Sequence, residues 1–218
     1  MAEALAPAHL LTLARWLSPA FPTGAFAWSH GLEAAVRDGE VRDAPTLAAW
    51  LDAYLRLGAG RSDAILLAAA HRAGSDEEIE ALADLATALA PSRERRDEAL
   101  WLGRAFAAAL RAADGIEVAP APYPVALGRA ARLAGLPALP VALLHLQAAA
   151  TNLVAAAQRL MPLGQSAAAA LAASLAPAAR EVAEEAMAGD PEALGGCALL
   201  MDAASMRHEA QDARIFRS

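Results

Sequence analysis

The stretch Leu139-Pro-Val-Ala-Leu-Leu-His-Leu-Gln-Ala-Ala-Ala-Thr-Asn-Leu-Val-Ala-Ala-Ala-Gln-Arg-Leu-Met161 carries the longest apolar pattern in the chain. Its apolar side chains recur at alternating steps of four and three, which places them on one face of an α-helix. They are Leu139, Leu143, Leu146, Ala150, Leu153, Ala157 and Leu160. Pro140 is tolerated in a first helical turn, and Pro162 with Gly164 ends the pattern. The helix would be roughly 33 Å long, which predicts a central core helix over residues 140–161.

The sequence on both sides of this stretch also predicts helices. Alanine is the commonest residue, whereas the β-branched and aromatic residues that favour strands are sparse. A chain of 218 residues is long enough for one domain with a sizeable core. We therefore expect an all-α fold, in which residues 1–218 form a single-domain bundle of about ten helices around the central helix.

Local signals mark several helix starts. Asp43-Ala-Pro45 and Ser75-Asp-Glu-Glu78 match an N-cap followed by an early proline or by a glutamate. Pro91-Ser92 precedes a longer helix, whose first turn, Arg93-Glu-Arg-Arg-Asp-Glu98, is dense with charge. We interpret that turn as a solvated face with local ion pairs. Asp190-Pro191 is the expected start of a last helical region.

The charged residues exclude several classes of function. All 18 basic residues are arginine, so the chain has no lysine. A P-loop needs its lysine on the phosphates, and a pyridoxal or Schiff-base enzyme needs an amine. High genomic GC content would produce the same bias, but the exclusion holds in either case. The formal net charge of −7 disfavours nonspecific binding to nucleic acid or to an anionic membrane.

The sequence also gives expectations about location. The single cysteine, Cys197, cannot form an internal disulfide, which agrees with a reducing cytoplasm, and its Leu and Ala neighbours predict a small core residue. The N-terminus lacks the basic region, apolar run and cleavage site of a signal peptide. Polar residues or proline interrupt the alanine-rich runs before they reach the roughly 20 apolar residues that span a bilayer. We expect a soluble cytoplasmic protein that does not enter a membrane.

The sequence offers no self-contained metal site. The five histidines are scattered, and neither a Cys-x-x-Cys nor a His-x-x-x-His pattern occurs. We expect no metal site within a single chain and no cofactor. A site completed across a dimer axis, or by a partner, stays open as an alternative.

Two groups of residues are candidates for acid–base or nucleophilic catalysis. His30 and Glu33 are three positions apart on one expected helical face, and Ser205, His208 and Glu209 lie close together near the C-terminus. His208 and Glu209 would point to different sides of a helix, and neither group adjoins a Gly-rich oxyanion turn. We expect no catalytic residues. The alternative is a small helical hydrolase that uses His208 or His30 with a neighbouring carboxylate.

The C-terminal segment, residues 204–218, differs from the frayed, polar end that most chains have. It finishes in Ile215-Phe-Arg217, large side chains and a guanidinium of the kind that anchor one protein on another. If the segment is helical, Arg207, Gln211 and Arg214 line one side at steps of four and three. The alternative is that the segment packs back on its own domain.

Four blocks of the chain resemble, in order, the UreF family of urease accessory proteins. They are Ser18-Pro-Ala-Phe-Pro-Thr-Gly-Ala-Phe-Ala-Trp-Ser-His-Gly-Leu-Glu33, Tyr123-Pro-Val-Ala126, Leu160-Met-Pro-Leu-Gly-Gln165, and Ala204-Ser-Met-Arg-His-Glu209 through Arg214-Ile-Phe-Arg-Ser218. The resemblance extends over nearly the whole length. The departures from the family pattern, which affect single contacts, are Trp28, Met161, Ala210, Asp212 and Ala213.

The resemblance implies an all-helical adaptor that has no enzymatic activity of its own. Members of the family bind a second accessory protein, UreD (also called UreH), and recruit the GTPase UreG. The assembly helps to load nickel into apo-urease at the expense of GTP. A homodimer at the centre of the complex is also implied. An adaptor for another GTPase is the remaining alternative within this class of function.

The resemblance also assigns residues. The C-terminal block is thought to order against UreD, and its partner-binding residues correspond to Ser205, Met206, Arg207, His208, Glu209, Gln211, Arg214, Phe216 and Arg217. The first block contains a turn, which we call the signature turn, whose role lies between fold and contact with the GTPase. Its residues are Pro22, Gly24, Phe26, Ser29, His30, Gly31 and Glu33.

Overall fold

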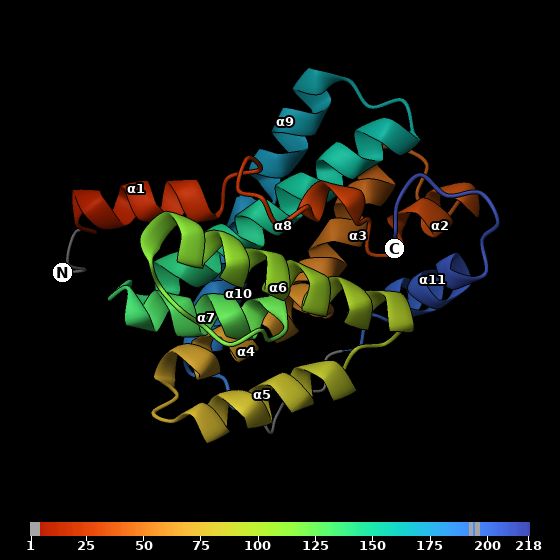
Figure 1. Ribbon diagram of the computed structural model, residues 1–218. Coiled ribbons are helices and arrows are strands. Elements are labelled where there is room, and N and C mark those ends of the chain that lie inside the picture. The colour runs from red at the N-terminus through yellow and green to blue at the C-terminus, as the bar shows by residue number, and fades with distance from the viewer. Residues whose placement is uncertain (1–4, 192–193, 195–196) are drawn as a thin grey trace.

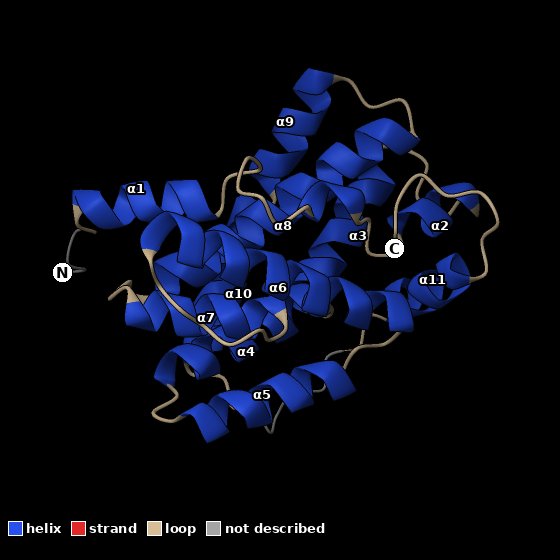
Figure 2. Ribbon diagram, in the orientation of Figure 1, coloured by secondary structure: helices blue, strands red, loops and turns tan. Residues whose placement is uncertain are grey.

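The computed structural model describes residues 5–191, 194 and 197–218, and all regular structure in these ranges is helical (Figure 1, Figure 2). The prediction of an all-α fold is confirmed. In chain order the elements are α1 (Pro7–Trp16), the 3-10 helix η1 (Ala25–Ala27), α2 (Leu32–Arg37), α3 (Ala44–Arg56), α4 (Ala59–Arg72), α5 (Asp76–Ala88), α6 (Arg93–Asp114), α7 (Tyr123–Leu133), α8 (Ala138–Leu160), α9 (Gln165–Ser174), α10 (Ala176–Met187) and α11 (Leu199–Glu209).

The long apolar stretch forms α8, which packs against α2, α3, α4, α7, α9 and α10. Leu146, Ala150, Leu153 and Ala157 of the predicted face are buried, whereas Leu139 in the first turn is exposed. The buried face therefore begins later than the sequence pattern indicates. The central position of this helix is as predicted.

By length and composition alone, α8 would also be able to cross a membrane. This corrects the expectation that polar residues interrupt the apolar run too early for a span. Of its most apolar window, 39% of the residues are buried inside the protein. Since α8 packs against six helices of the same domain, it is a core helix of this fold.

The predicted capping residues are in place. Asp43 accepts the backbone N–H of Thr46 at 2.9 Å, and the Thr46 hydroxyl accepts the N–H of Asp43 at 3.1 Å. Ser75 accepts the N–H of Glu78 at 3.3 Å. At the start of α6, the Ser92 hydroxyl accepts the N–H of Arg95 at 3.1 Å. These bonds satisfy backbone donors that a helix start leaves free.

Several details differ from the expectation. The first turn of α6 is not a fully solvated face, because Glu94 and Glu98 are buried. Cys197 is exposed and free rather than part of the core. The last helix, α11, begins at Leu199, and the start expected at Asp190-Pro191 adjoins positions outside the described residues.

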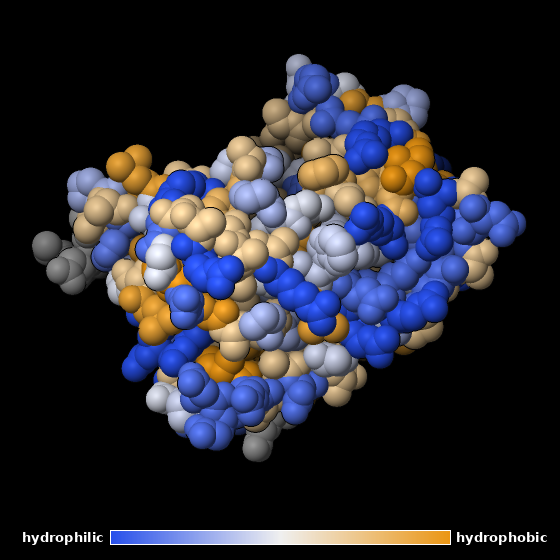
Figure 3. All heavy atoms as spheres, viewed as in Figure 1, coloured by the Kyte–Doolittle hydropathy of each residue, from blue (hydrophilic) through white to orange (hydrophobic). Residues whose placement is uncertain are grey.

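The signature turn with α2 and the C-terminal segment meet on one side of the molecule, away from the N-terminus (Figure 1). α11 packs along α2, and the chain after α11 loops back to finish beside the signature turn (Figure 1). The same side is mostly hydrophilic in the space-filling view (Figure 3). The contacts that hold this side together define the candidate functional site.

Candidate functional site

Three segments far apart in the sequence form the site: the signature turn with α2, the first two turns of α6, and the C-terminal segment. The signature turn owes its shape to left-handed backbone at Gly24 and Gly31, with φ values of 77° and 76°. At Gly31 a Cβ atom would lie 2.6 Å from the backbone nitrogen of Ser205. Glycine is required there because it permits both the backbone angle and the close approach of α11.

His208, in the last turn of α11, lies at the centre of the site and is fully buried. Its Nδ1 is 2.7 Å from Glu94 Oε2 of α6, and its Nε2 is 3.2 Å from Glu33 Oε2 of α2. One imidazole therefore joins the three segments, and a carboxylate faces each of its ring nitrogens.

Glu33 holds the end of the chain through its carboxylate. Oε1 accepts the backbone N–H of Ile215 and Oε2 that of Phe216, both at 2.8 Å. The Gln211 side chain approaches Oε1 at 3.4 Å. Because the side chain of Glu33 is almost fully buried, these donors replace the water that a carboxylate needs.

The start of α6 is capped from the C-terminal segment. The carboxylate of Glu209 accepts the N–H groups of Arg93 and Glu94 at 2.7 and 3.3 Å, the favourable place for an anion at a helix N-terminus. The hydroxyls of Ser92 and Ser205 meet at 2.6 Å. Arg214 donates to the second oxygen of Glu94 at 2.6 Å.

A second ionic cluster lies one turn further along α6. Glu98 is paired with Arg95, with His30 Nε2 at 2.8 Å, and with the Ser218 hydroxyl at 3.1 Å. Burial by itself would raise the pKa of Glu98, but Arg95 and then His30 lower it to about 2. Burial also lowers the pKa of His30, with Arg95 adding to this effect. Glu98 is therefore a buried anion beside a histidine that tends to be neutral.

Backbone and apolar contacts complete the closure of the C-terminal segment. The N–H of Ser29 donates to the main-chain oxygen of Ser218 at 2.9 Å, and the N–H of Arg217 donates to Ala27 O at 2.8 Å. Phe216 is only 4% exposed, and the guanidinium of Arg159 lies 4.2 Å from its ring centroid. The alternative stated from the sequence, that the segment packs back on its own domain, describes this structure.

On the surface above these contacts, Arg217 stacks on aromatic side chains. Its guanidinium carbon lies 5.1 Å from the ring centroid of Trp101 and 5.8 Å from that of Trp28. Phe26 of the signature turn precedes Ala27, whose carbonyl accepts the N–H of Arg217, and its side chain is exposed. Ile215, two positions before Arg217, is exposed as well. We call Phe26, Trp101, Ile215 and Arg217 the composite surface, since the signature turn, α6 and the C-terminal segment all contribute to it.

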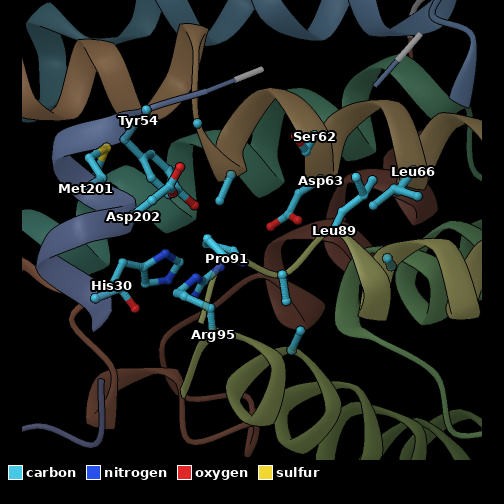
Figure 4. A pocket seen from close by; sticks show the side chains of 17 residues that line it. His30, Tyr54, Ser62, Asp63, Leu66, Leu89, Pro91, Arg95, Met201 and Asp202 are labelled. Atoms are coloured by element: carbon cyan, nitrogen blue, oxygen red, sulfur yellow. The ribbon is translucent and has the colours of Figure 1, made fainter. Parts of the chain in front are cut away.

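Two cavities adjoin the second ionic cluster, at His30 and Arg95. The smaller, of about 110 Å³, is lined by His30, Tyr54, Asp63 and Arg95 among others (Figure 4). The larger, of about 470 Å³, extends beside α8 and shares these four residues. The pKa of Tyr54 is raised by burial and by Asp63, so its hydroxyl stays protonated and can serve as a hydrogen-bond donor in the cavity wall.

The structure brings together most of the residues that the resemblance assigned. Ser29, His30, Gly31 and Glu33 of the signature turn contact the C-terminal segment. Pro22 and Phe26 are instead exposed, and Gly24 serves only the turn. In the C-terminal segment Ser205, His208 and Phe216 are buried, Met206 and Arg217 are exposed, and Arg207 pairs with Asp38 and Glu40 at 2.9 and 2.7 Å.

Two expectations about geometry were wrong. His30 and Glu33 do not share a helical face, because His30 precedes α2 with a φ of 55° and reaches Glu98, while Glu33 reaches His208. The C-terminal segment is helical only to Glu209, so Arg207, Gln211 and Arg214 do not form one stripe. His208 and Glu209 do point to different partners, as expected.

Sequence reasoning missed the α6 half of the site. Ser92, Arg95, Glu98 and Trp101 recur at steps of three, and Ser92, Glu94 and Glu98 are buried whereas Trp101 is exposed. A stripe of Ser92, Arg95 and Glu98 at steps of three was the available signal. The spacing did not lead to a prediction of burial, because six consecutive charged residues more often form a solvent-exposed helix face.

The geometry does not favour the alternative of a small helical hydrolase. His208 is buried with both nitrogens engaged and lines neither of these two cavities, whereas His30 lines both. In the part of the chain that the structure describes, no three His, Cys, Asp or Glu side chains gather as metal ligands. Fold and site together define a class: an all-helical domain in which a buried ionic cluster joins the signature turn and α6 to the C-terminal segment and supports a surface patch.

Comparison with known proteins identifies the family within this class. The sequence profile of the UreF family matches residues 41–176. A urease accessory protein UreF from Cereibacter sphaeroides (strain KD131 / KCTC 12085) is 54% identical over 211 residues, which cover 97% of this chain and 99% of the relative. Relatives of the same name from Xanthobacter autotrophicus and from a Jannaschia species are both 47% identical, covering 99% and 96% of this chain and 94% of each relative.

The chain belongs to the UreF family of urease accessory proteins. Proteins of this family are not catalytic. The resemblance read from four sequence blocks is confirmed.

Proposed function

We propose that this chain is an adaptor that binds UreD (UreH) and recruits the GTPase UreG, so that nickel is inserted into apo-urease with GTP hydrolysis by the partner. Membership of a family of urease accessory proteins supports this proposal. The absence of lysine supports a nucleotide site on a partner rather than on this chain.

The composite surface is the observation that carries the proposal. Phe26 is 69% exposed, Ile215 57% and Trp101 52%, and Arg217 lies on Trp101. Tryptophan and arginine are the side chains most enriched among residues that dominate binding energy at protein interfaces. The buried network holds these large side chains on the surface, where their exposure to water costs free energy that a partner recovers by covering them.

The partner-binding residues assigned by resemblance divide into two roles in this proposal. Met206 and Arg217 are exposed and contact the partner directly. Ser205, His208 and Phe216 are buried, so they hold the C-terminal segment in place and act on the partner through its exposed face. Arg207, Glu209, Gln211 and Arg214 fasten the segment at its margins.

Further parts of the proposal rest on resemblance to the family. Residues 1–218 act as one domain, with 204–218 as the partner-docking segment, and two copies form a homodimer at the centre of the assembly. The protein works in the cytoplasm and contacts neither nucleic acid nor a membrane. The negative net charge supports the last two points.

The test is co-purification of the chain with UreD and UreG of the same organism, with and without GTP and nickel. The double variant Trp101→Ala, Arg217→Ala should lower the recovery of UreD at least about tenfold, the loss typical of two interface anchors. Leu11→Ala, a change at a 74% exposed side chain of α1, is the matched control. Undiminished capture of UreD by the double variant would refute the assignment of this surface. GTP turnover by the isolated chain would refute the adaptor role.

A further inference from the structure

The larger cavity, beside α8, reaches the surface next to the composite surface. Its lining includes Phe26 of the composite surface and Leu144 and Thr151 of α8, and all three are exposed. The side chain of Asn152 donates to Ala25 O at 3.1 Å, so the 3-10 helix that carries Phe26 is held against α8 at this rim. The cavity, of about 470 Å³, is therefore within reach of a protein that docks on the composite surface.

Most of the cavity wall is apolar, and buried side chains form its floor. They include Leu13 of α1, Tyr54 of α3 and His145 of α8. Asp63 of α4 lies among them, and it also lines the smaller cavity (Figure 4). A deep, largely apolar pocket with a few polar groups is the usual form of a site that takes up a ligand or an anchoring side chain.

The carboxylate of Asp63 has no strong cationic partner among the described residues. Its ion-pair contact is with His145, whose Nε2 lies 3.9 Å from Oδ2, too far for a hydrogen bond. The guanidinium of Arg95 lines the same cavity, but it is bound to Glu98, whose charge it cancels. Of the carboxylates and guanidinium groups in the described lining, Asp63 is therefore left with one uncompensated negative charge.

The negative charge of Asp63 acts on two tyrosines of the same wall. Burial raises the pKa of the Tyr54 and Tyr123 hydroxyls, and Asp63 raises the pKa of both further. Both hydroxyls therefore stay protonated, and their oxygens can accept hydrogen bonds beside the carboxylate. The floor of the cavity thus suits a positively charged group that carries N–H donors.

We propose that this cavity receives an arginine or lysine side chain of the partner that docks on the composite surface, with its aliphatic part along the apolar wall and its charged end at Asp63. Such side chains cover apolar surface with their stems. A carboxylate without a cation in a largely apolar cavity costs free energy in the isolated chain, and a cationic group recovers it on binding. This inference rests on the proposed function, because it names what the partner inserts.

The isolated chain tests the cavity without any partner. The probe n-butylguanidinium has the head group and a stem like that of arginine, whereas n-butanol has the stem without the charge. In NMR titrations followed at the side chains of Tyr54 and His145, n-butylguanidinium should bind at least about tenfold more tightly than n-butanol. Asp63→Asn keeps the shape and removes the charge, so it should make the two affinities equal.

Asp84→Asn, at an exposed carboxylate of α5, is the matched control and should keep the difference between the two probes. Equal affinities in the unmodified chain would overturn the proposal, and so would a difference that Asp63→Asn leaves intact.

The stability of Asp63→Asn distinguishes a binding role from a structural one. Because the carboxylate has no strong cationic partner in the described part of the chain, its neutralisation should leave the melting temperature unchanged or raise it. A carboxylate that held the fold together would lose stability on the same change. A clear fall in the melting temperature relative to Asp84→Asn would therefore overturn the proposal.

Binding of UreD connects the cavity with docking. Asp63→Asn should weaken this binding at least about tenfold, whereas Asp84→Asn should not change it. Undiminished binding by Asp63→Asn would overturn the proposal and leave the adaptor role intact. If the unmodified chain does not bind UreD, the proposed function fails, and the titration with n-butylguanidinium still decides whether the cavity accepts a cation.

Discussion

The carboxylate of Glu33 accepts the backbone N–H of Phe216 at 2.8 Å, although the two residues are 183 positions apart in the sequence. This bond fixes the direction in which the chain leaves α11 and places the ring of Phe216 in the core. A residue of the signature turn thus determines the position of the C-terminal segment. The four sequence blocks of the family resemblance include both residues.

We expect Glu33→Ala to destabilise the closed C-terminal segment by about 3 kcal/mol, because it leaves buried N–H donors and His208 without their acceptor. Glu33→Gln keeps one carbonyl oxygen as an acceptor and should cost less. Urea unfolding, with exchange at Ile215, measures both. Glu117→Ala, a change at an exposed carboxylate, is the control and should leave stability within about 0.5 kcal/mol. Equal stability of Glu33→Ala and the control would show that the carboxylate is not structural.

Phe216→Ala and Phe26→Ala should separate the two roles of the site. Phe216 is buried, so its truncation should cost about 3 kcal/mol of segment stability and weaken docking to UreD by about 2 kcal/mol. Phe26 is exposed, so its truncation should leave the melting temperature nearly unchanged and still weaken docking. Calorimetry and binding to UreD distinguish them. If Phe26→Ala binds UreD normally, this side chain lies outside the interface.

Complete removal of residues 205–218 is a less specific experiment than the sequence suggests. From the family resemblance and the large side chains at the end of the sequence, the deletion would abolish co-purification with UreD and leave helical content and melting almost unchanged. In the structure the segment carries buried side chains at Ser205, His208 and Phe216. We therefore expect the deletion to lower the melting temperature as well. Unchanged melting would show that the segment closes only weakly on the domain.

Much of the fold was predictable because it depends on local signals. The spacing of Leu146, Ala150 and Leu153 placed the central helix, and the side chains of Asp43 and Ser75 placed helix starts that the structure confirms. Each of these signals acts within a few turns of one helix, where periodicity and capping decide the outcome.

The ionic site was only half predictable because its bonds join distant segments. The sequence marked Glu33 and His208 but gave no reason to pair them with Glu94 or Glu98. Burial of those glutamates depends on where α11 and the signature turn pack, which no local pattern encodes. Leu89 is a difference in the opposite direction. The sequence spacing of Ile79, Leu82, Ala86 and Leu89 predicts a buried stripe, but Leu89 follows the last residue of α5, a helix that packs mainly on α4 and α7, and its side chain is exposed.

The pair Gly31→Ala and Gly24→Ala should show which glycine serves the site. Both residues have a left-handed backbone, so either change costs roughly 1 kcal/mol for its φ alone. At Gly24 a Cβ meets nothing within 4 Å, whereas at Gly31 it would lie 2.6 Å from Ser205 N. We expect Gly31→Ala to cost several times more in urea unfolding and to separate α11 from α2. Equal costs for the two variants would mean that α11 tolerates displacement.

The cluster of Glu98 and His30 predicts loss of stability on the acid side. The pKa of Glu98, lowered to about 2 from 4.5, means that its contribution is complete above pH 4.5 and is lost as the pH falls toward 2. That difference corresponds to about 3 kcal/mol. The pKa of His30 is lowered by burial, so the unfolded chain binds a proton below pH 6.5 more readily than the folded chain does. Its contribution is therefore lost as the pH falls below 6.5.

Urea unfolding between pH 7.5 and pH 4 tests both effects. The free energy of unfolding should decline below pH 6.5 and more steeply below pH 4.5, the ordinary values for the two groups. His30→Asn, chosen because asparagine tolerates the left-handed backbone at this position, should remove most of the decline between pH 6.5 and 5. Glu117→Gln, at an exposed position, should not change it. If His30→Asn keeps the full decline in this range, other titrating groups control the acid stability, because the variant no longer has an imidazole at Glu98.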